Sequence, residues 1–153
     1  MIVYRLSKSK FAGDLSGKGA EIAGGRWNSK GVAVIYTGES RALCVAEIAV
    51  HTGLGNIPKD YQLVSIEIPD DAEIFKIAVT ELSPNWSSIP HLATTQILGD
   101  RLLQLNRHLV IKVPSAVVQG DFNYLINPKH KDFNKVKIVK IEEFSFDKRM
   151  FIK

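Results

Sequence analysis

Arg26 stands in a context that suggests anion binding. It follows two glycines in the stretch "GGRWN", residues 24–28. A guanidinium recognises phosphate through two parallel hydrogen bonds, and neighbouring glycines let a backbone come close to a ligand. The stretch therefore favours a phosphate-binding arginine, and the alternative is a surface arginine beside a turn.

Glu47 is the second candidate, because it lies in "CVAEIAV", where nearly every other residue is apolar. On a helix, its neighbours one turn away would be Leu43, Cys44, Val50 and His51. A carboxylate among buried residues needs a partner or a task, since burying an unpaired charge is costly. We interpret Glu47 as a candidate catalytic carboxylate, and a narrow exposed stripe of the helix is the alternative.

Ser115 and Tyr36 carry weaker local signals. Ser115 follows Pro114, and serines beside prolines are common in turns. No nucleophile elbow surrounds it and no His/Asp pair is identifiable as its triad, so serine hydrolase chemistry is unsupported. Tyr36 ends an expected strand, where it could belong to the core or form an aromatic floor for a flat ligand.

Metal and nucleotide motifs are missing from the sequence. The histidines lack helical ligand spacing, and a single cysteine, Cys44, excludes a Cys-rich metal site and an intramolecular disulfide. The stretch "GKGAEIAGG" superficially resembles a dinucleotide fingerprint, but its final glycines precede a strand with no predicted helix between. No P-loop is present. We therefore expect neither a metal nor a Rossmann-type cofactor site.

Composition is that of one globular domain spanning residues 1–153, with 45% hydrophobic and 24% charged residues. The apolar runs are too short to span a bilayer, and "MIVYRLSKSK" lacks the order of a secretory signal. One cysteine fits a reducing compartment. The sequence thus predicts a cytoplasmic protein without membrane attachment.

The net charge of +4 permits attraction to phosphates or an acidic partner without demanding nucleic acid. The C-terminal third is rich in lysine, which we interpret as a solvated face. The following lysines belong to it: Lys129, Lys131, Lys135, Lys137 and Lys140. A small basic nucleic-acid-binding module would need a basic face with interleaved aromatic residues, and the lysines are scattered instead.

Hydrophobic periodicity predicts many strands and two main helices, hence one α+β domain. Strands are expected at 2–6, 32–37, 61–68, 72–79, 108–118 (interrupted by Pro114), 121–130 (strand or turn) and 135–146, and helices at 39–53 and 94–107. The apolar phase of the last strand shifts between Ile138 and Val139, which predicts a bulge. The segment 7–31 is expected to be a long functional loop.

The first helix should be capped by Ser40 and end at Gly53. The second should be capped by Thr94 or Thr95. Its apolar stripe would consist of Ile97, Leu98, Leu102 and Leu105.

Taken in order, several stretches resemble the RES domain, the toxin half of RES–Xre toxin–antitoxin pairs. They are "GGRWNSKGVAVIYTGES", "ALCVAEIAVH", "LGDRLL", "VPSAVV" and "NYLINPKH". The resemblance runs from the first strand to about residue 134, and the part from residue 25 to 40 is the most specific.

The resemblance implies a set of site residues. The family's arginine falls on Arg26, its tyrosine on Tyr36, its glutamate on Glu47 and its serine on Ser115. Two further positions are implied as substrate-binding residues, Arg5 in the first strand and Asn123 before "LINP". No metal is implied.

The resemblance also implies a fold and an activity. The fold would resemble ADP-ribosyltransferase toxins, with a mixed, strongly twisted sheet flanked by helices. NAD⁺ would be a substrate rather than a cofactor, with inorganic phosphate as an acceptor, or a protein would be ADP-ribosylated instead. The partner would be an Xre-type helix-turn-helix antitoxin that covers the active site. A homodimer is a further possibility that the resemblance leaves undecided.

Chemistry then assigns roles to these residues. Nicotinamide departs neutral from NAD⁺ without a general acid, while the ribose gains oxocarbenium character. Arg26 would bind the diphosphate or the adjoining ribose, and Glu47 would bond the nicotinamide ribose hydroxyls and stabilise the cationic sugar. Tyr36 would stack on nicotinamide, and Ser115 would orient Arg26 or the substrate.

Overall fold

The computed structural model describes residues 1–152, which form an α+β domain around one mixed sheet. The seven strands follow the order β4-β5-β6-β2-β1-β3-β7, and all neighbours are antiparallel except β4 and β5. The strands are β1 (Ile2–Lys8), β2 (Ile35–Gly38), β3 (Tyr61–Glu67), β4 (Ile74–Lys76), β5 (Val110–Pro114), β6 (Phe122–Ile126) and β7 (Lys137–Phe144).

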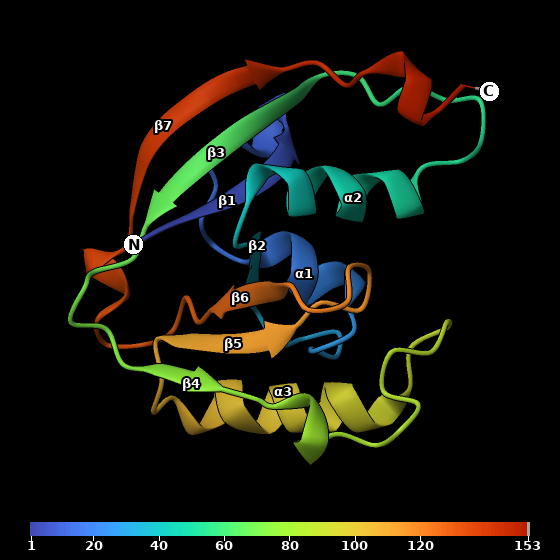
Figure 1. Cartoon of the computed structure of the whole chain (residues 1–153). Coiled ribbons are helices and arrows are strands. Elements are labelled where there is room, and N and C mark those ends of the chain that lie inside the picture. The colour runs from blue at the N-terminus through green and yellow to red at the C-terminus, as the bar shows by residue number, and fades with distance from the viewer. Residues whose placement is uncertain (153) are drawn as a thin grey trace.

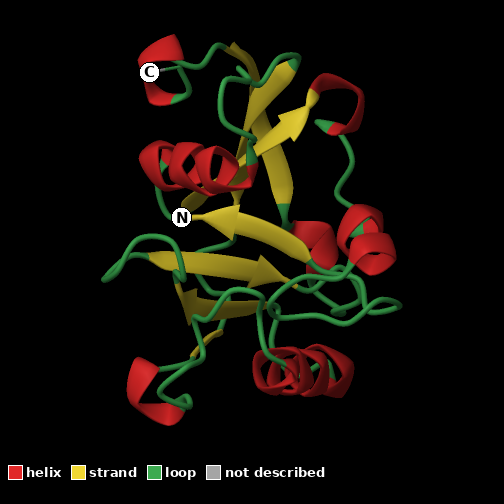
Figure 2. Ribbon diagram, turned by 90° about the vertical axis from the view of Figure 1, so that its right-hand side faces the viewer, coloured by secondary structure: helices red, strands yellow, loops and turns green. Residues whose placement is uncertain are grey.

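Two long helices accompany the two halves of this sheet. The helices are α1 (Lys18–Ala23), α2 (Arg41–His51) and α3 (Ala93–Leu105), with short 3₁₀ turns η1 (Ser9–Phe11), η2 (Val79–Glu81), η3 (Phe133–Lys135) and η4 (Lys148–Met150). In Figure 1, α2 lies beside β1 and β3, whereas α3 runs along β4 and β5. Figure 2 shows the strong twist between the two halves of the sheet, as the resemblance implied.

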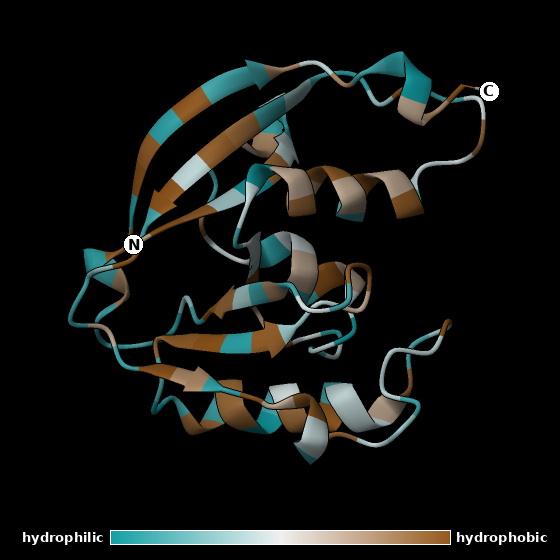
Figure 3. Ribbon diagram, viewed as in Figure 1, coloured by the Kyte–Doolittle hydropathy of each residue, from teal (hydrophilic) through white to brown (hydrophobic). Residues whose placement is uncertain are grey.

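The helix α2 forms largely as expected. The Ser40 hydroxyl accepts a 3.0 Å hydrogen bond from the Leu43 N–H and so caps the first turn. Leu43 and Cys44 are buried, and Cys44 packs with Leu6 of β1. Hydrophobic residues dominate α2 in Figure 3. The helix ends at His51, two residues before the expected glycine.

The helix α3 differs from the prediction in both its cap and its buried face. Its N-cap is Leu92, without a side-chain cap, and Thr95 instead donates back to the Leu92 carbonyl at 3.2 Å. Leu98 and Leu102 pack against the core, but Ile97 is 65% exposed and Leu105 is 48% exposed. The most buried positions are Thr95, Gly99 and Leu103. The predicted apolar face of α3 was therefore partly wrong, because the backbone of residues 24–29 packs against this helix.

Two expectations for the N-terminal third were also wrong. The segment 7–31 contains η1 and α1, and the latter is too short to show helical periodicity in the sequence. The strand expected at 32–37 begins only at Ile35, although it is the central strand of the sheet.

Two expected strands later in the chain are shorter than predicted. Pro114 ends β5 rather than interrupting it, and β4 keeps only three of the eight expected residues.

The bulge predicted near Val139 is confirmed. Ser65 pairs with Lys140 and Ile66 pairs with Ile138, so Val139 has no partner on β3. The extra residue on this edge strand shifts the side-chain alternation by one position, so that Ile138 pairs with Ile66 and Ile141 with Val64, although Ile141 stays 42% exposed. Hydrophobic and hydrophilic residues accordingly alternate along β7 in Figure 3.

The sheet has an apolar core on each face. Val110 belongs to a cluster with Val3, Ile35 and Val64, whereas Ile111, the next residue of β5, packs with Trp27 under α3. Successive strand residues point to opposite faces. We call the face of the sheet that carries Ile111, and against which Trp27 packs, the α3 face.

Candidate active site

Arg26 lies at the tip of a tight turn. The turn is closed by a 2.9 Å hydrogen bond from the Gly25 N–H to the Asn28 carbonyl. The Arg26 guanidinium donates from Nη1 to the carbonyls of Trp86 and Ser88 at 2.9 and 3.2 Å. Burial lowers the pKa of Arg26, and the charge of Glu47 opposes this shift. The arginine is therefore held by a distant loop and does not extend freely into solvent.

The two glycines before Arg26 serve different purposes. Gly24 has a φ of +69°, a conformation that side chains disfavour. Gly25 has no such φ, but a Cβ there would lie 2.7 Å from the Tyr36 hydroxyl and 3.0 Å from Asn28 Oδ1. The sequence suggested that glycine makes room for a ligand here. The structure gives a reason within the protein itself, the close approach of Tyr36.

Tyr36 holds this turn from the central strand β2. Its hydroxyl donates to Asn28 Oδ1 at 2.6 Å and accepts from the Trp27 N–H at 3.0 Å. Burial is the main reason why the pKa of Tyr36 is raised. Tyr36 packs against the cluster of Trp27 and Trp86, whose rings are 6.1 Å apart. Trp27 is thus a core residue, and the Tyr36 ring borders that core.

Glu47 projects from α2 into a half-buried position. Burial raises the pKa of Glu47, while hydrogen bonding from Asn123, the charge of His51, hydrogen bonding from Ser115 and the charge of Arg26 pull it down. The structure therefore brings Glu47, Arg26, Ser115 and Asn123 together from segments far apart in the sequence. Glu47 does not occupy a freely solvated stripe of α2.

Strand register explains how Asn123 and Ser115 reach the same place. Asn123 pairs with Gly38 on β2, two residues after Tyr36, so both side chains share the α3 face. Asn123 also pairs with Val113 of β5, two residues before Ser115. The Asn123 amide donates to the Thr37 carbonyl at 3.3 Å, which fixes its direction.

Ser115 is buried and organises the turn after β5. Its hydroxyl oxygen accepts from the N–H groups of Val117 and Val118 at 3.1 and 3.0 Å. Its proton remains available for Glu47, whose pKa it lowers. The suggestion that Ser115 orients Arg26 was wrong, because the Trp86 and Ser88 carbonyls do so.

Arg5 is not brought into this group. Its neighbour Tyr4 pairs with Gly38 and shares the α3 face, so Arg5 points to the opposite face, where it pairs with Val64. Its guanidinium donates from Nη2 to the carbonyls of Phe11 and Ala12 at 3.0 and 3.3 Å. Burial lowers its pKa. In this structure, Arg5 anchors the segment around η1.

Sequence reasoning overlooked Asn28, although it is completely buried. Its amide donates to the carbonyls of Ala20 and Val32 at 2.8 and 2.9 Å, and its Oδ1 accepts from Tyr36. It thereby joins α1, β2 and the Arg26 turn. The only signal was its position two residues after Arg26 in "GGRWN".

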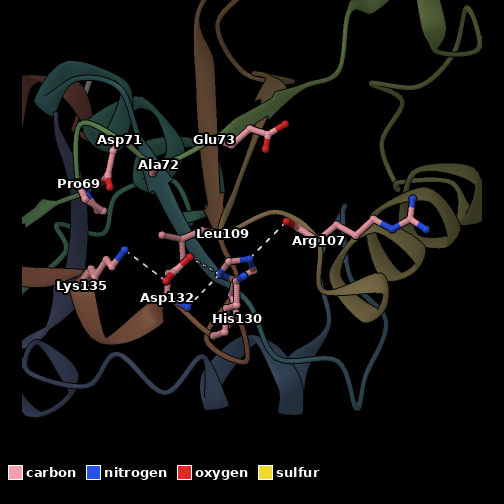
Figure 4. A pocket seen from close by; sticks show the side chains of 10 residues that line it. Pro69, Asp71, Ala72, Glu73, Arg107, Leu109, His130, Asp132 and Lys135 are labelled. Atoms are coloured by element: carbon pink, nitrogen blue, oxygen red, sulfur yellow. Dashed lines mark hydrogen bonds and ion pairs between the residues drawn. The ribbon is translucent and has the colours of Figure 1, made fainter.

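A separate cavity of about 260 Å³ lies beside β4 and η3 (Figure 4). The His130 ring lies between Arg107 and Asp132, where Nδ1 accepts from the Asp132 N–H at 3.1 Å and Nε2 faces the Arg107 carbonyl at 3.3 Å. Both ring nitrogens are thus engaged in local structure. None of the predicted site residues lines this cavity.

Other kinds of chemistry find little support within residues 1–152. They contain no cluster of His, Cys, Asp and Glu that could hold a metal ion. The Cys44 thiol donates to the Tyr4 carbonyl at 3.2 Å, and burial raises its pKa to about 11. No helix in this part of the chain is long and apolar enough to cross a membrane.

Comparisons with known proteins show which proteins this chain resembles. The RES domain profile matches residues 2–147. The chain is 39% identical over 144 residues to "Prs ADP-ribosylating toxin" of Sphingobium sp. (strain YBL2), covering 93% of this chain and 89% of that protein. It is 35% identical over 153 residues to "Toxin Res" of Photorhabdus laumondii, covering 98% and 97%.

The fold has a counterpart among solved structures. The crystal structure of the M. tuberculosis MbcT-MbcA toxin-antitoxin complex contains a chain that superimposes with a TM-score of 0.76. The match covers 94% of this chain and 84% of that one, at 20% identity. At this identity, the likeness establishes a shared fold.

Proposed function

This chain belongs to the RES domain family, and from that premise we propose that it is the toxin of a toxin–antitoxin pair that cleaves the nicotinamide–ribose bond of NAD⁺. The observation that carries the proposal is that Glu47 and Arg26 lie near enough for the charge of each to oppose the effect of burial on the pKa of the other. A carboxylate and a guanidinium in the same site match the two charged parts of NAD⁺, a developing cationic ribose and a diphosphate.

The reaction needs little proton transfer at the bond that breaks. The electron pair of the C–N bond goes to the nicotinamide nitrogen, which becomes neutral, and the ribose carbon becomes oxocarbenium-like. Water or inorganic phosphate then forms the new bond to that carbon and gives up a proton. The enzyme therefore has to hold the dinucleotide and stabilise positive charge on the sugar.

Glu47 suits the stabilisation of positive charge on the ribose. Its carboxylate is half-buried, and charges interact more strongly where water is excluded. Asn123 and Ser115 lower the pKa of Glu47 as hydrogen-bond donors, which favours the ionised form against the cost of burial. An ionised, oriented Glu47 can bond the ribose hydroxyls and stabilise the oxocarbenium.

Arg26 suits the binding of the dinucleotide through its diphosphate, because its guanidinium is anchored on one side only. Within residues 1–152, its hydrogen bonds all start from Nη1. A guanidinium carries five N–H donors, so the edge formed by Nε and Nη2 can still meet two phosphate oxygens. Tyr36, beside this turn, would contact the nicotinamide ring.

A second candidate acceptor is a protein side chain. The relative of Sphingobium sp. is named as an ADP-ribosylating toxin, and the chain shares 39% identity with it. The bond that breaks would be the same, and only the attacking group would differ. Arg26 and Glu47 would keep their roles in either reaction.

We also propose an antitoxin partner. A site that binds an anionic dinucleotide should present positive potential at its mouth, and a chain of net charge +4 fits this. A helix-turn-helix protein encoded beside this one could insert a carboxylate-bearing segment over Arg26. NAD⁺ turnover should then stop in the stable complex.

Product analysis tests the proposal directly. Purified protein would be incubated with NAD⁺, with and without phosphate, and the products identified by mass spectrometry. Release of nicotinamide with ADP-ribose or its phosphate ester is expected, and expression of the chain alone should arrest growth and deplete NAD⁺. Growth arrest with unchanged NAD⁺ would exclude bulk NAD⁺ degradation and favour the protein acceptor.

A further inference from the structure

We propose that Gln96, Gly99 and Asp100 of α3 are positioning residues that fix the Arg26 turn and thereby set the affinity for NAD⁺. Gly99 and Asp100 lie three and four residues after Gln96, so all three are on one side of α3, and we call them the α3 row. The row includes the start of the "LGDRLL" stretch, to which the site described above assigns no role. The effect on NAD⁺ rests on the proposed function, whereas the effect on the turn does not.

Gln96 joins the two ends of the turn. Its Nε2 donates to the Gly25 carbonyl at 2.9 Å and to the Asn28 carbonyl at 3.2 Å. Residues 25 and 28 are the positions that close the turn around Arg26 and Trp27. One amide therefore holds both strands of the turn at a fixed separation.

Gly99 lets the turn lie directly on the helix. A Cβ on Gly99 would lie 1.8 Å from the Trp27 carbonyl oxygen and 2.7 Å from its carbonyl carbon. Any side chain there must push away the backbone next to Arg26. Gly99 is fully buried as a consequence of this contact, although glycine lowers helix propensity.

Asp100 holds the chain as it leaves the turn. Its carboxylate accepts from the Ser29 N–H at 2.8 Å and from the Ser29 hydroxyl at 2.5 Å. Hydrogen bonds to an ionised acceptor are stronger than neutral ones. The turn is therefore fixed at its beginning, middle and end by the three residues of the α3 row.

This arrangement matters for Arg26 because, within residues 1–152, its guanidinium donates hydrogen bonds only to carbonyls of the loop after η2. The carbonyls of Trp86 and Ser88 determine where Nη1 points, but the row on α3 determines where the Arg26 backbone lies. A guanidinium that binds two phosphate oxygens tolerates little displacement. Loss of the row should therefore weaken NAD⁺ binding without removing any group that touches NAD⁺.

The test compares Gln96→Met with Gln104→Met, an exposed glutamine two turns later on the same helix. Methionine keeps the size of the side chain and removes the amide donor. NAD⁺ affinity would be measured by calorimetry, and KM and kcat by nicotinamide release. We expect Gln96→Met to raise Kd and KM about tenfold with a smaller change in kcat, as for the loss of one or two hydrogen bonds, and Gln104→Met to match the parent.

A double-mutant cycle separates positioning from general stability. In an Arg26→Lys background, Gln96→Met should have little further effect on NAD⁺ affinity, because the group that it positions has already been changed. A purely structural Gln96 would lower the melting temperature and leave KM unchanged, or its effect would simply add to that of Arg26→Lys. Either result overturns the proposal.

A readout without substrate keeps this test independent of the proposed function. In nitrogen-15 spectra, Gln96→Met and Gly99→Ala should move the Arg26 Nε–H and Trp27 indole signals, and Gln104→Met should not. If the parent neither binds nor cleaves NAD⁺, the proposed function fails, and the spectra still decide the positioning. Unmoved signals in Gln96→Met would show that the turn does not depend on α3.

Discussion

The Tyr36 hydroxyl donates a 2.6 Å hydrogen bond to Oδ1 of the buried Asn28 and, at the same time, accepts one from the Trp27 N–H. This contact ties the turn that carries Arg26 to the central strand of the sheet. On its other side, the turn rests on α3 through Gln96. A flexible-looking, glycine-rich stretch is thus fixed between two regular elements, which suits the diphosphate-binding role that we propose for Arg26.

Gly25→Ala should destabilise the protein because the new Cβ would lie 2.7 Å from the Tyr36 hydroxyl. Overpacking of this kind costs about 1–3 kcal/mol, and each kcal/mol lowers the melting temperature by about 2–4 °C in a chain of this size. Thermal unfolding of Gly25→Ala and of Gly13→Ala, where a Cβ would meet open space, measures the difference. Equal melting temperatures would contradict the close contact.

Glu47→Gln should separate binding from catalysis. Glutamine can still hydrogen-bond a ribose hydroxyl, but it removes the charge that faces the developing oxocarbenium. The turnover of NAD⁺ should fall by about a hundred- to a thousandfold, while Kd changes little. Calorimetry with NAD⁺ and assays of nicotinamide release give the two quantities. Turnover at the parent rate would make Glu47 a structural carboxylate.

The raised pKa of Glu47 predicts opposite effects of pH on activity and on stability. Activity requires the ionised form, so the acid limb of the rate profile should lie above the usual glutamate pKa of about 4.3. Because the folded protein holds the Glu47 proton more tightly than the unfolded chain, this group stabilises the fold at low pH and loses that contribution as pH rises through the folded pKa. Glu47→Gln should therefore unfold at a higher temperature than the parent at pH 7–8, and the difference should vanish below about pH 4. A parent protein that unfolds at a higher temperature than Glu47→Gln at pH 8 would contradict the predicted direction of this difference.

Arg26→Lys should act mainly on affinity. Lysine keeps the positive charge but cannot make the planar pair of hydrogen bonds to a diphosphate. We expect Kd for NAD⁺ to rise about tenfold or more, with a smaller change in kcat, in calorimetry and steady-state assays. An unchanged Kd would place the diphosphate elsewhere.

Ser115→Ala should reduce stability and shift the acid limb of the rate profile. It leaves the N–H groups of Val117 and Val118 without their acceptor, which costs about 1–3 kcal/mol. It also removes a hydrogen bond that lowers the pKa of Glu47, so the limb should move to higher pH. Exposed Ser87→Ala serves as the control. A lower melting temperature with an unmoved pH profile would restrict Ser115 to the turn.

Local rules predicted much of the fold. The Ser40 cap, the register shift at Val139 and most of the strands follow from capping, side-chain alternation and periodicity, which act over a few residues. The short α1 and the buried face of α3 were missed. In α3, contact with the backbone of Trp27 decides that Gly99 is buried and Ile97 is exposed, and no helical period contains that information.

The sequence by itself determined which residues were candidates, because Arg26 after two glycines and Glu47 in an apolar helix stand out by type and by resemblance. Only the tertiary structure decided which of them meet. The pairing of β2 with β6 and of β6 with β5 places Tyr36, Asn123 and Ser115 on one face. The pairing of β1 with β2 places Arg5 on the opposite face of the sheet. The physical reason is that a strand alternates its side chains every residue, so pairing partners distant in sequence decide what each side chain can reach.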